Sequence, residues 1–542
     1  MSYIEIDNLN FTYPLEQERS LKNINLSLEK NDFLLVAGRS GSGKSTLARA
    51  IVGTVPNFYG GTIGGEIKID GKPVDKMSHQ ERAKKITMVF QDPERQLMMN
   101  KVHREIAFGL ENIGADEGVI KRRVYEALQF TGILHLADRD VTSLSGGEKQ
   151  KVAVASALVY MPNCIILDEP TSQLDPSSAE EMLNLVKKIN EELGITIIVI
   201  EQRVNRWFDT VDSIAIMNEG TLQLFRDKKD FYYNCSEKQY MFMPDYLKFF
   251  KKLGFDNMPR DFKDARVKIL NTPIKMEKHE EAIAAAEDES VILSVDKMSC
   301  KYGSKEVLSN LSFEIKKGEF ISIMGANGAG KSTLLKSIMG LKTYKGTMKL
   351  HDRDINKMGI REIAQHIGYV SQNPNDYLSK DSVYQEVRFT MDNYDIYDEK
   401  IVKDVLEELE IYDFKDKNPR DLSGGQRQRV AIATILVLQP DMILLDEPTR
   451  GLESGLKGKL GRLLQRLNYR GTTIVLVTHD TDFASSFCKR YMIMFNGAIV
   501  ADGSKEKVLG DGIFYTTSMN KLLREKDRSI FTLEEAVRRC RV

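Results

Sequence analysis

The stretch Gly38 to Thr46 reads G-R-S-G-S-G-K-S-T and follows an apolar run, Phe33 to Ala37. A glycine-rich loop that ends in Gly-Lys-Ser, after a strand and before a helix, is the pattern of a phosphate-binding P-loop. Its glycines let successive backbone amides converge on an anion, and the start of the following helix adds a positive dipole end. Lys44 is expected to contact the β- and γ-phosphates of a nucleotide, and the Ser45 hydroxyl to bind Mg²⁺.

The same loop recurs as G-A-N-G-A-G-K-S-T from Gly325 to Thr333. Two copies, each followed by the same later motifs, indicate an internal duplication. The sequence therefore predicts two nucleotide sites in one chain. The candidate loop residues are Gly38, Ser40, Gly41, Gly43, Lys44, Ser45 and Thr46, and Gly325, Asn327, Gly328, Gly330, Lys331, Ser332 and Thr333.

Length and composition restrict the class of protein. The 542 residues exceed one hydrophobic core, and the net charge of −1 offers no basic field for nucleic acid or an anionic membrane. The longest apolar runs fall far short of the roughly 20 residues of a membrane span, and the N-terminus lacks a signal pattern. Five scattered cysteines, without a C-x-x-C, argue against disulfides, zinc and iron–sulfur clusters, and predict reduced cytosolic thiols.

Two adjacent acids end an apolar strand in each half, at Asp168-Glu169 and Asp446-Glu447. Buried carboxylates are costly unless metal or phosphate chemistry uses them. We expect the two aspartates to hold Mg²⁺ and the two glutamates to polarise the attacking water. A glutamine ends an earlier strand in each half and is a candidate for reaching the metal or the water. These glutamines are Gln91 and Gln372.

A second anion-binding design is L-S-G-G at the start of a helix, with Ser145 and Gly147 in the first half and Ser423 and Gly425 in the second. The alternative is a serine that only caps its helix. Upstream of each P-loop lies a tyrosine, Tyr13 or Tyr302. Each is either a packed turn residue or a ring that stacks on adenine.

The order P-loop, glutamine, L-S-G-G, Asp-Glu and S-x-L-D (Ser172 to Asp175) resembles the nucleotide-binding domain of the ATP-binding cassette (ABC) superfamily. In this family the L-S-G-G motif is called the signature. The signature serine and the expected metal-binding aspartate are 23 residues apart in both halves, Ser145 to Asp168 and Ser423 to Asp446. The resemblance implies an α/β fold with two tandem P-loop NTPase domains, each with a mixed sheet core and a helical subdomain. The expected parts are a first domain (1–228), a linker or accessory segment (229–288), a second domain (289–510) and a C-terminal tail (511–542).

The resemblance also implies that the two cassettes pair within one chain and bind ATP and Mg²⁺ between the P-loop of one and the signature of the other. His479 matches the family's switch histidine, which senses the γ-phosphate, whereas the first half has Gln202 there. The second S-x-L-D motif ends in Glu453 instead of aspartate. Because glutamine cannot carry positive charge, we expect an asymmetric ATPase whose first site turns over more slowly. The alternative is that Gln202 substitutes adequately.

A narrower resemblance lies after the first glutamine, in F-Q-D-P-E-R-Q-L (Phe90 to Leu97) and E-I-A-F-G-L-E-N (Glu105 to Asn112). These stretches are similar to the ATPases of energy-coupling factor (ECF) importers, with a weaker version at Ser371 to Leu378. That resemblance implies uptake of a vitamin, cofactor precursor or metal ion. It also implies two membrane partners, a transmembrane coupling subunit and a substrate-binding subunit, and a peripheral position on the cytoplasmic face of the cell membrane.

The acids Asp92, Glu94 and Glu105 are candidates for receiving basic helices of a membrane subunit, or are merely a solvated acidic face. The competing function is a soluble twin-cassette ATPase that acts on ribosomes. Such a protein would need a basic arm for RNA, and residues 226–288 carry 13 basic and 12 acidic side chains. We therefore expect no nucleic-acid partner. The aromatic stretch Tyr240 to Phe250 is expected to form a small core, and Thr532 to Arg539 a helix.

Overall fold

The computed structural model describes residues 2–541 except 203, 256, 278–289, 375–376, 451 and 453. The chain divides into two compact units, Met1–Ala265 and Arg266–Val542. Each unit contains one of the two P-loops. The finer division at residues 228, 288 and 510 remains a prediction.

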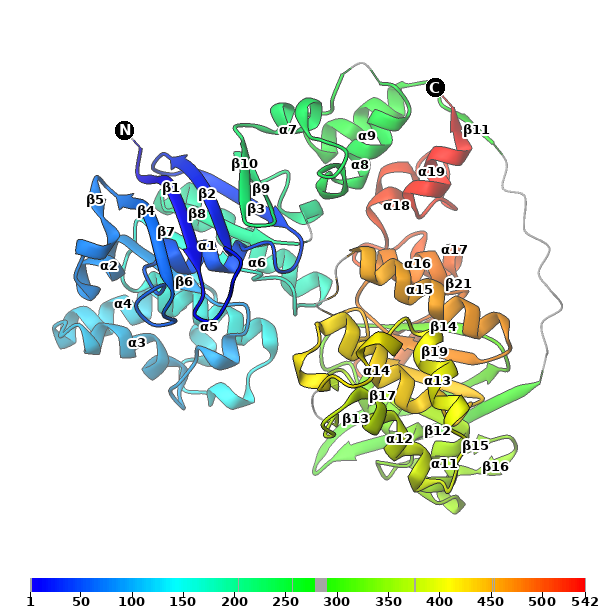
Figure 1. Ribbon diagram of the computed structural model, residues 1–542. Helices are drawn as coiled ribbons and strands as arrows, with labels where there is room; N and C mark the ends of the chain where they lie inside the picture. The colour runs from blue at the N-terminus through cyan, green and yellow to red at the C-terminus, as the bar shows by residue number, and fades with distance from the viewer. Residues whose placement is uncertain are drawn as a thin grey trace. The chain divides into compact units, whose positions relative to one another are not determined.

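Two sheets build the first unit (Figure 1). A small antiparallel sheet has the order β2-β1-β4-β5, and a core sheet has the order β10-β9-β3-β8-β7-β6, parallel except for the β9/β10 hairpin. The core strands β3, β7 and β8 are buried along their whole length, as parallel strands covered on both faces are. The strands are β1 (Ile4–Thr12), β2 (Leu21–Leu28), β3 (Phe33–Gly38), β4 (Thr62–Ile69), β5 (Lys72–Pro73), β6 (Ile86–Val89), β7 (Cys164–Asp168), β8 (Thr196–Glu201), β9 (Ser213–Asn218) and β10 (Thr221–Phe225).

Helices of the first unit fall into two groups. Helices α3, α4 and α5 share a hydrophobic core of their own, which includes Ile106, Leu128 and Val152, and so form the expected helical subdomain. Helix α1 follows the P-loop directly. The bounds are α1 (Lys44–Ile51), α2 (His79–Lys85), α3 (Val102–Asn112), α4 (Glu117–Phe130), α5 (Gly146–Leu158) and α6 (Pro176–Leu193).

Aromatic residues after β10 form a small core, as expected. Helices α7 (Lys228–Asn234), α8 (Asp245–Lys252) and α9 (Phe262–Asn271) follow the strand. Tyr246 and Phe250 of α8 are buried, and the Tyr246 hydroxyl donates a hydrogen bond to Asp209 Oδ1 at 2.6 Å. The Phe262 amide donates to the other oxygen of the same carboxylate. The acidic stretch Glu280 to Asp288 lies outside the described residues.

The second unit repeats the strand order of the first. Its small sheet is β13-β12-β15-β16, and its core sheet is β17-β18-β19-β14-β20-β21. This repetition confirms the expected fold class of two P-loop domains with mixed sheets. The strands are β12 (Val291–Tyr302), β13 (Lys305–Lys316), β14 (Phe320–Met324), β15 (Lys345–Leu350), β16 (Arg353–Asp354), β17 (Ile367–Val370), β18 (Met442–Asp446), β19 (Thr473–Val477), β20 (Arg490–Phe495) and β21 (Ala498–Ser504).

Helices of the second unit occupy the same places in the chain order. Helices α12, α13 and α14 are the helical subdomain, and their apolar faces join one core with Val387, Leu406 and Val430. The bounds are α10 (Lys331–Ile338), α11 (Ile360–His366), α12 (Val383–Asn393), α13 (Glu399–Glu408), α14 (Gly424–Leu436), α15 (Ser454–Tyr469) and α16 (Thr481–Phe487).

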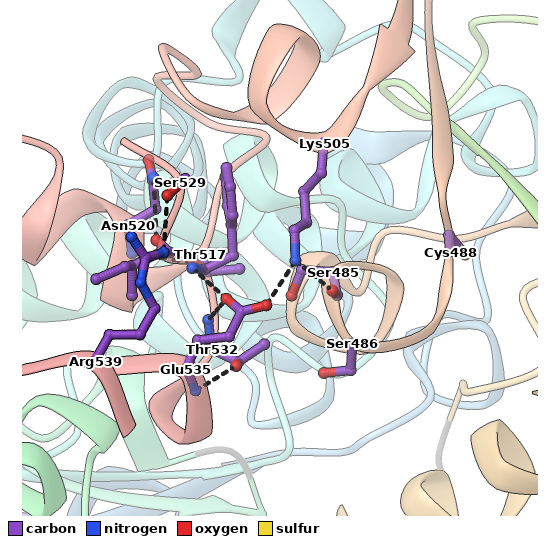
Figure 2. A network of polar contacts seen from close by, with 12 residues as sticks. Ser485, Ser486, Cys488, Lys505, Thr517, Asn520, Ser529, Thr532, Glu535 and Arg539 are labelled. Carbon is purple, nitrogen blue, oxygen red and sulfur yellow. Dashed lines mark hydrogen bonds and ion pairs between the residues drawn. The ribbon is translucent and has the colours of Figure 1, made fainter. Parts of the chain in front are cut away.

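Residues after β21 pack onto the second unit. Helices α17 (Lys505–Leu509), α18 (Ser518–Leu523) and α19 (Leu533–Arg539) follow one another, and a two-residue strand β22 (Cys540–Arg541) pairs with β11 (Lys275–Met276). Figure 2 shows Lys505 between Ser485 and Glu535, with its Nζ donating to the Glu535 carboxylate at 2.8 Å. Thr532 and Glu535 form a capping box at the start of α19, which confirms the predicted helix.

Two further expectations concern the membrane and the thiols. Among the described residues, no helix has the length and apolar character needed to cross a bilayer. All five cysteines lie in the described part of the chain, and each is a free thiol.

Candidate nucleotide-binding and catalytic sites

Lys44 lies at the first turn of α1, and its side chain folds back over the loop. The Nζ atom donates to the carbonyls of Gly38 and Arg39 at 2.8 and 2.7 Å, and the residue is 5% exposed. Gly43 has φ of 101°, and a Cβ there would lie 2.6 Å from the Ser20 carbonyl oxygen. Only glycine fits that backbone, which explains why the loop can curl.

The second P-loop has the same geometry. Lys331 Nζ donates to the carbonyls of Gly325 and Ala326 at 2.6 and 2.9 Å, and Gly330 has φ of 102°. The two loops therefore present a buried ammonium and a helix start in the same way. This arrangement is suited to binding a phosphate chain.

Asp168 and Glu169 lie at the carboxyl end of β7, beside the P-loop. Asp168 is 5% exposed and accepts a hydrogen bond from the Ser45 hydroxyl. Within the described residues, its Oδ1 has no hydrogen-bond partner although it is buried. Burial raises the pKa of Asp168, and the Ser45 hydroxyl lowers it. A buried aspartate oxygen beside a serine hydroxyl is an arrangement that fits a Mg²⁺ ion.

In the first unit, the Glu169 carboxylate accepts hydrogen bonds from the side-chain amides of two glutamines. Gln91 Nε2 donates to its Oε2 at 2.7 Å, and Gln202 Nε2 donates to its Oε1 at 2.5 Å. Burial, with the neighbouring Glu201 carboxylate, raises the pKa of Glu169 to about 7. The structure thus brings both predicted glutamines to the predicted general base.

Glu201 is a buried carboxylate that the sequence motifs did not identify. It is 2% exposed at the end of β8, and its Oε1 accepts hydrogen bonds from the Thr171 hydroxyl and the Trp207 indole. The corresponding residue of the second unit is Thr478, whose hydroxyl lies 3.4 Å from that of Thr449. The first unit therefore has a buried carboxylate where the second has a threonine hydroxyl, whereas the second unit has the Asp480 carboxylate close to Glu447. The only signal in the sequence is a glutamate directly before Gln202.

Glu447 and His479 pair in the second unit. His479 Nε2 lies 3.1 Å from Glu447 Oε1 and 3.0 Å from Asn327 Oδ1 of the P-loop. Burial raises the pKa of Glu447, and the positive charge of Lys331 opposes that rise. Asp446 accepts a hydrogen bond from the Ser332 hydroxyl, as Asp168 does from Ser45. Gln372 follows β17 and is exposed, and Glu453 lies outside the described residues.

Both signature serines cap their own helices. Ser145 forms a capping box with Glu148 at the start of α5, and Ser423 forms one with Gln426 at the start of α14. Ser145 Oγ also donates to Glu148 Oε2 at 2.7 Å. The capping alternative is thus realised in each unit. Ser145 and Ser423 are exposed, so a capping role does not prevent their contact with a phosphate, whereas Gly147 is half-buried and Gly425 is buried.

The two tyrosines differ in their surroundings. The Tyr13 hydroxyl lies 3.2 Å from the Thr46 hydroxyl and accepts a hydrogen bond from Arg49, so the ring is fixed beside the P-loop helix. Tyr302 is 43% exposed, and Lys342 Nζ lies 4.5 Å from its ring centroid. The Tyr13 hydroxyl thus anchors its ring to the P-loop helix, whereas the contact of Tyr302 is with Lys342, beyond the end of α10.

Glu105 does not belong to an acidic docking face. It is 6% exposed, and its Oε2 accepts from the amides of Met98 and Met99 at 2.8 and 2.6 Å. Glu386 does the same for Ser379 and Lys380 in the second unit. The expectation that Glu105 receives a partner's basic helix is therefore wrong, because its carboxylate is buried and accepts hydrogen bonds from the preceding loop. Glu94 is exposed and accepts from Lys149.

Fold and sites together define a P-loop ATPase with two cassettes. A sequence profile of the family described as "ABC transporter" matches residues 21–172 and 308–450. A Bacillus anthracis protein named as an ABC transporter ATP-binding protein is 36% identical over 546 residues, which cover 100% of this chain and 98% of the relative. One of Clostridium tetani with that name is 40% identical over 78% of this chain and 96% of its own.

Among solved structures, CbiO1 of Clostridium perfringens, described as part of the ABC transporter complex CbiONQ, is 33% identical. The match covers 47% of this chain and 96% of CbiO1, with a TM-score of 0.40. The chain belongs to the ATP-binding proteins of ABC transporters. It is an ATPase with duplicated nucleotide-binding domains.

Proposed function

We propose that this ATPase energises a membrane importer of the energy-coupling factor type. The observation that supports the importer type is the segment after the first glutamine, F-Q-D-P-E-R-Q-L to E-I-A-F-G-L-E-N. In the structure Asp92 caps a 3-10 turn, Pro93–Arg95, and Glu105 holds the loop that follows. That loop presents Met98, which is 67% exposed. A fixed loop with an exposed methionine is suited to docking on another protein.

Lys44 and Lys331 are proposed to bind the β- and γ-phosphates, with the amides of residues 38–46 and 325–333 around the phosphate chain. Ser45 with Asp168, and Ser332 with Asp446, would hold Mg²⁺, with Gln91 and Gln372 close to it. Bound Mg²⁺ would neutralise charge on the phosphate oxygens. Tyr13 and Tyr302 are proposed to stack on adenine.

Glu169 and Glu447 are proposed to orient and polarise the attacking water. A carboxylate with a pKa near 7 accepts a proton more readily than an ordinary glutamate does, which suits a general base at neutral pH. His479, held between Glu447 and Asn327, would contact the γ-phosphate. Gln202 is neutral and donates to Glu169, so it holds the base without adding positive charge.

We further propose that each nucleotide is held by the P-loop of one cassette and the signature of the other, as in the family. The first site would use Ser423 and Gly425, and the second Ser145 and Gly147. Closure on ATP and opening after hydrolysis would drive the membrane subunits, with this chain on the cytoplasmic face.

The test of ATP binding uses Lys44→Ala and Lys331→Ala in the full chain. Loss of a charged hydrogen bond to phosphate predicts about 10- to 100-fold weaker ATP binding at the altered site. Unchanged binding in the double variant would contradict the assignment. For turnover, Glu447→Gln is expected to remove most ATP hydrolysis and Glu169→Gln much less. Equal losses would contradict the asymmetry.

The importer proposal is tested by cross-linking. A photoreactive amino acid at Met98 is expected to capture a hydrophobic membrane subunit in intact membranes. The matched control places it at Tyr233, which is 57% exposed on α7. Capture of a ribosomal protein, or co-sedimentation with ribosomes, would favour the ribosome-acting alternative. Mass spectrometry of the small molecule that co-purifies with the captured complex identifies the transported substrate.

A further inference from the structure

Three metal-binding side chains meet in the second unit, away from the nucleotide site. His351 follows β15, His366 ends α11 and Asp441 precedes β18. One ligand atom from each lies within 4.8 Å of the others. Asp441 Oδ2 is 3.1 Å from His351 Nε2 and 2.9 Å from His366 Nδ1. The three side chains are 38–41% exposed, so solvent ions can reach them.

The position in the fold separates this cluster from the ATPase chemistry. Asp441 lies before the first residue of β18, whereas Asp446 and Glu447 lie at the other end of that strand. Five residues of extended strand span about 16 Å. His366 is likewise at the amino end of β17, whose carboxyl end leads to Gln372. The cluster therefore serves no step at the P-loop by direct contact.

The first unit shows what the duplicated fold uses at the same positions. Asp70 follows β4, Lys85 ends α2 and Asn163 precedes β7. Lys85 Nζ donates to Asp70 Oδ2 at 2.8 Å. A lysine–aspartate pair joins the small sheet to α2 there, and neither Lys85 nor Asn163 is a histidine, cysteine or carboxylate. In the second unit two imidazoles and a carboxylate have taken the place of that pair.

We propose that His351, His366 and Asp441 form a binding site for a divalent transition-metal ion of the Zn²⁺ class, completed by water. Neutral imidazole nitrogen with one carboxylate is a donor set that such ions prefer over Mg²⁺ or Ca²⁺. Ligand atoms in a tetrahedral zinc site are about 3.3 Å apart, as bonds of roughly 2.0–2.1 Å require. The two measured separations from Asp441 are close to that value, and rotation of the exposed rings would bring the two nitrogens together.

Metal binding would join three elements that are distant in sequence. The ion would connect the turn after β15 in the small sheet, the end of α11 and the start of β18 in the core sheet. The His351 amide already donates to Ile292, and the Asp441 carbonyl accepts from Thr473, so the backbones at both ends are fixed. An ion that binds only the folded protein raises its stability in proportion to the logarithm of ion concentration.

The experiment titrates the metal-stripped full chain with ZnCl₂ by calorimetry, without nucleotide and with excess Mg²⁺ to saturate the acidic nucleotide sites. We expect one Zn²⁺ per chain at this cluster and a higher melting temperature when Zn²⁺ is present. The double variant His351→Asp, His366→Lys copies the Asp70–Lys85 pair of the first unit. It is expected to fold without metal, to lose the bound Zn²⁺ and to lose the rise in melting temperature.

Two controls keep the result specific. His79→Asn alters an exposed histidine whose ring nitrogen lies 2.8 Å from Arg82, outside the cluster, and His479→Ala alters the histidine beside Glu447. Both variants should retain the Zn²⁺. Absence of stoichiometric Zn²⁺ binding in the unaltered chain, or full retention of it by the double variant, would overturn the proposal. Neither result depends on ATP hydrolysis or on a membrane partner.

Discussion

Gln202 Nε2 donates a 2.5 Å hydrogen bond to Glu169 Oε1, whereas His479 Nε2 lies 3.1 Å from Glu447 Oε1. The two glutamates proposed as general bases thus have different partners at the same position of a duplicated fold. One partner is a neutral amide and the other an imidazole that can become charged. This difference is the structural basis of the proposed asymmetry.

Exchanging Gln202 and His479 should raise ATP hydrolysis at the first site and lower it at the second. In a Glu447→Gln background, Gln202→His with Ser40→Asn gives the first unit the imidazole and the loop amide that the second unit has. We expect steady-state ATP hydrolysis to rise above that of the Glu447→Gln parent, because a positive charge near the γ-phosphate is restored. The reciprocal change, His479→Gln in the unaltered chain, should lower hydrolysis. A parent-like rate in the first variant would show that Gln202 does not limit the site.

Stability should depend on pH through Glu169. Its folded-state pKa of about 7 is above the ordinary value of 4.5, so the folded protein binds more protons than the unfolded chain between these values. The free energy of unfolding must therefore fall as pH rises through that window. Glu169→Gln removes the effect and should gain up to about 3 kcal/mol over the unaltered chain at pH 8, but little at pH 5. Urea denaturation without nucleotide or Mg²⁺ measures the difference in free energy of unfolding between Glu169→Gln and the unaltered chain. A difference that does not change with pH would contradict a raised pKa of Glu169.

Gly43→Ala should unfold the first P-loop locally, since its Cβ would lie 2.6 Å from the Ser20 carbonyl oxygen at a φ of 101°. We expect the protein to lose about 1–3 kcal/mol of stability. We also expect it to lose ATP binding at that site. The matched control is Gly41→Ala, because Gly41 also has a positive φ, 72°, but open space around its Cβ position. Thermal melting and nucleotide titration of the two variants should differ clearly. Equal effects would mean that backbone strain alone matters.

Tyr246→Phe tests the small core after β10. The hydroxyl donates to the half-buried Asp209 carboxylate at 2.6 Å, and hydrogen bonds to charged groups contribute about 1.5–3 kcal/mol. We expect the first unit to lose stability by that amount while ATP hydrolysis per folded molecule is retained. Tyr233→Phe, at a tyrosine that is 57% exposed, is the control and should change stability by less than about 0.5 kcal/mol. Similar denaturation curves for both variants would contradict the role of Asp209.

Motifs in the sequence predicted the parts of the fold that local chemistry determines. The apolar strand Phe33 to Ala37 and the Asp168-Glu169 pair were predictable because a buried parallel strand and its polar end have a recognisable composition. The helix at Thr532 was predictable from its capping residues. These features need only neighbours in sequence, and the structure confirms them.

Contacts that depend on the folded conformation of the chain were beyond such reasoning. Glu105 looks like a surface acid in the sequence, but the loop before it folds so that the amides of Met98 and Met99 donate to its carboxylate. Glu201 accepts hydrogen bonds from Thr171, 30 residues before it, and from Trp207 in the segment that follows β8. His351 and Asp441 are 90 residues apart and meet through the order of the strands. The sequence motifs do not mark these contacts, because they form only when the loops and strands fold.

The capping boxes of α5 and α14 differ by one charge. Burial opposes ionisation of Glu148, but hydrogen bonds from Ser145 hold its pKa below the ordinary value, so the start of α5 carries an anion. The start of α14 has the neutral Gln426 instead. A nucleotide phosphate that approaches α5 is repelled by that carboxylate, and dissolved salt screens the repulsion. Ionic strength should therefore change phosphate binding at the start of α5 more than at the start of α14. The concentration of potassium chloride then becomes a means of telling one ATP site from the other.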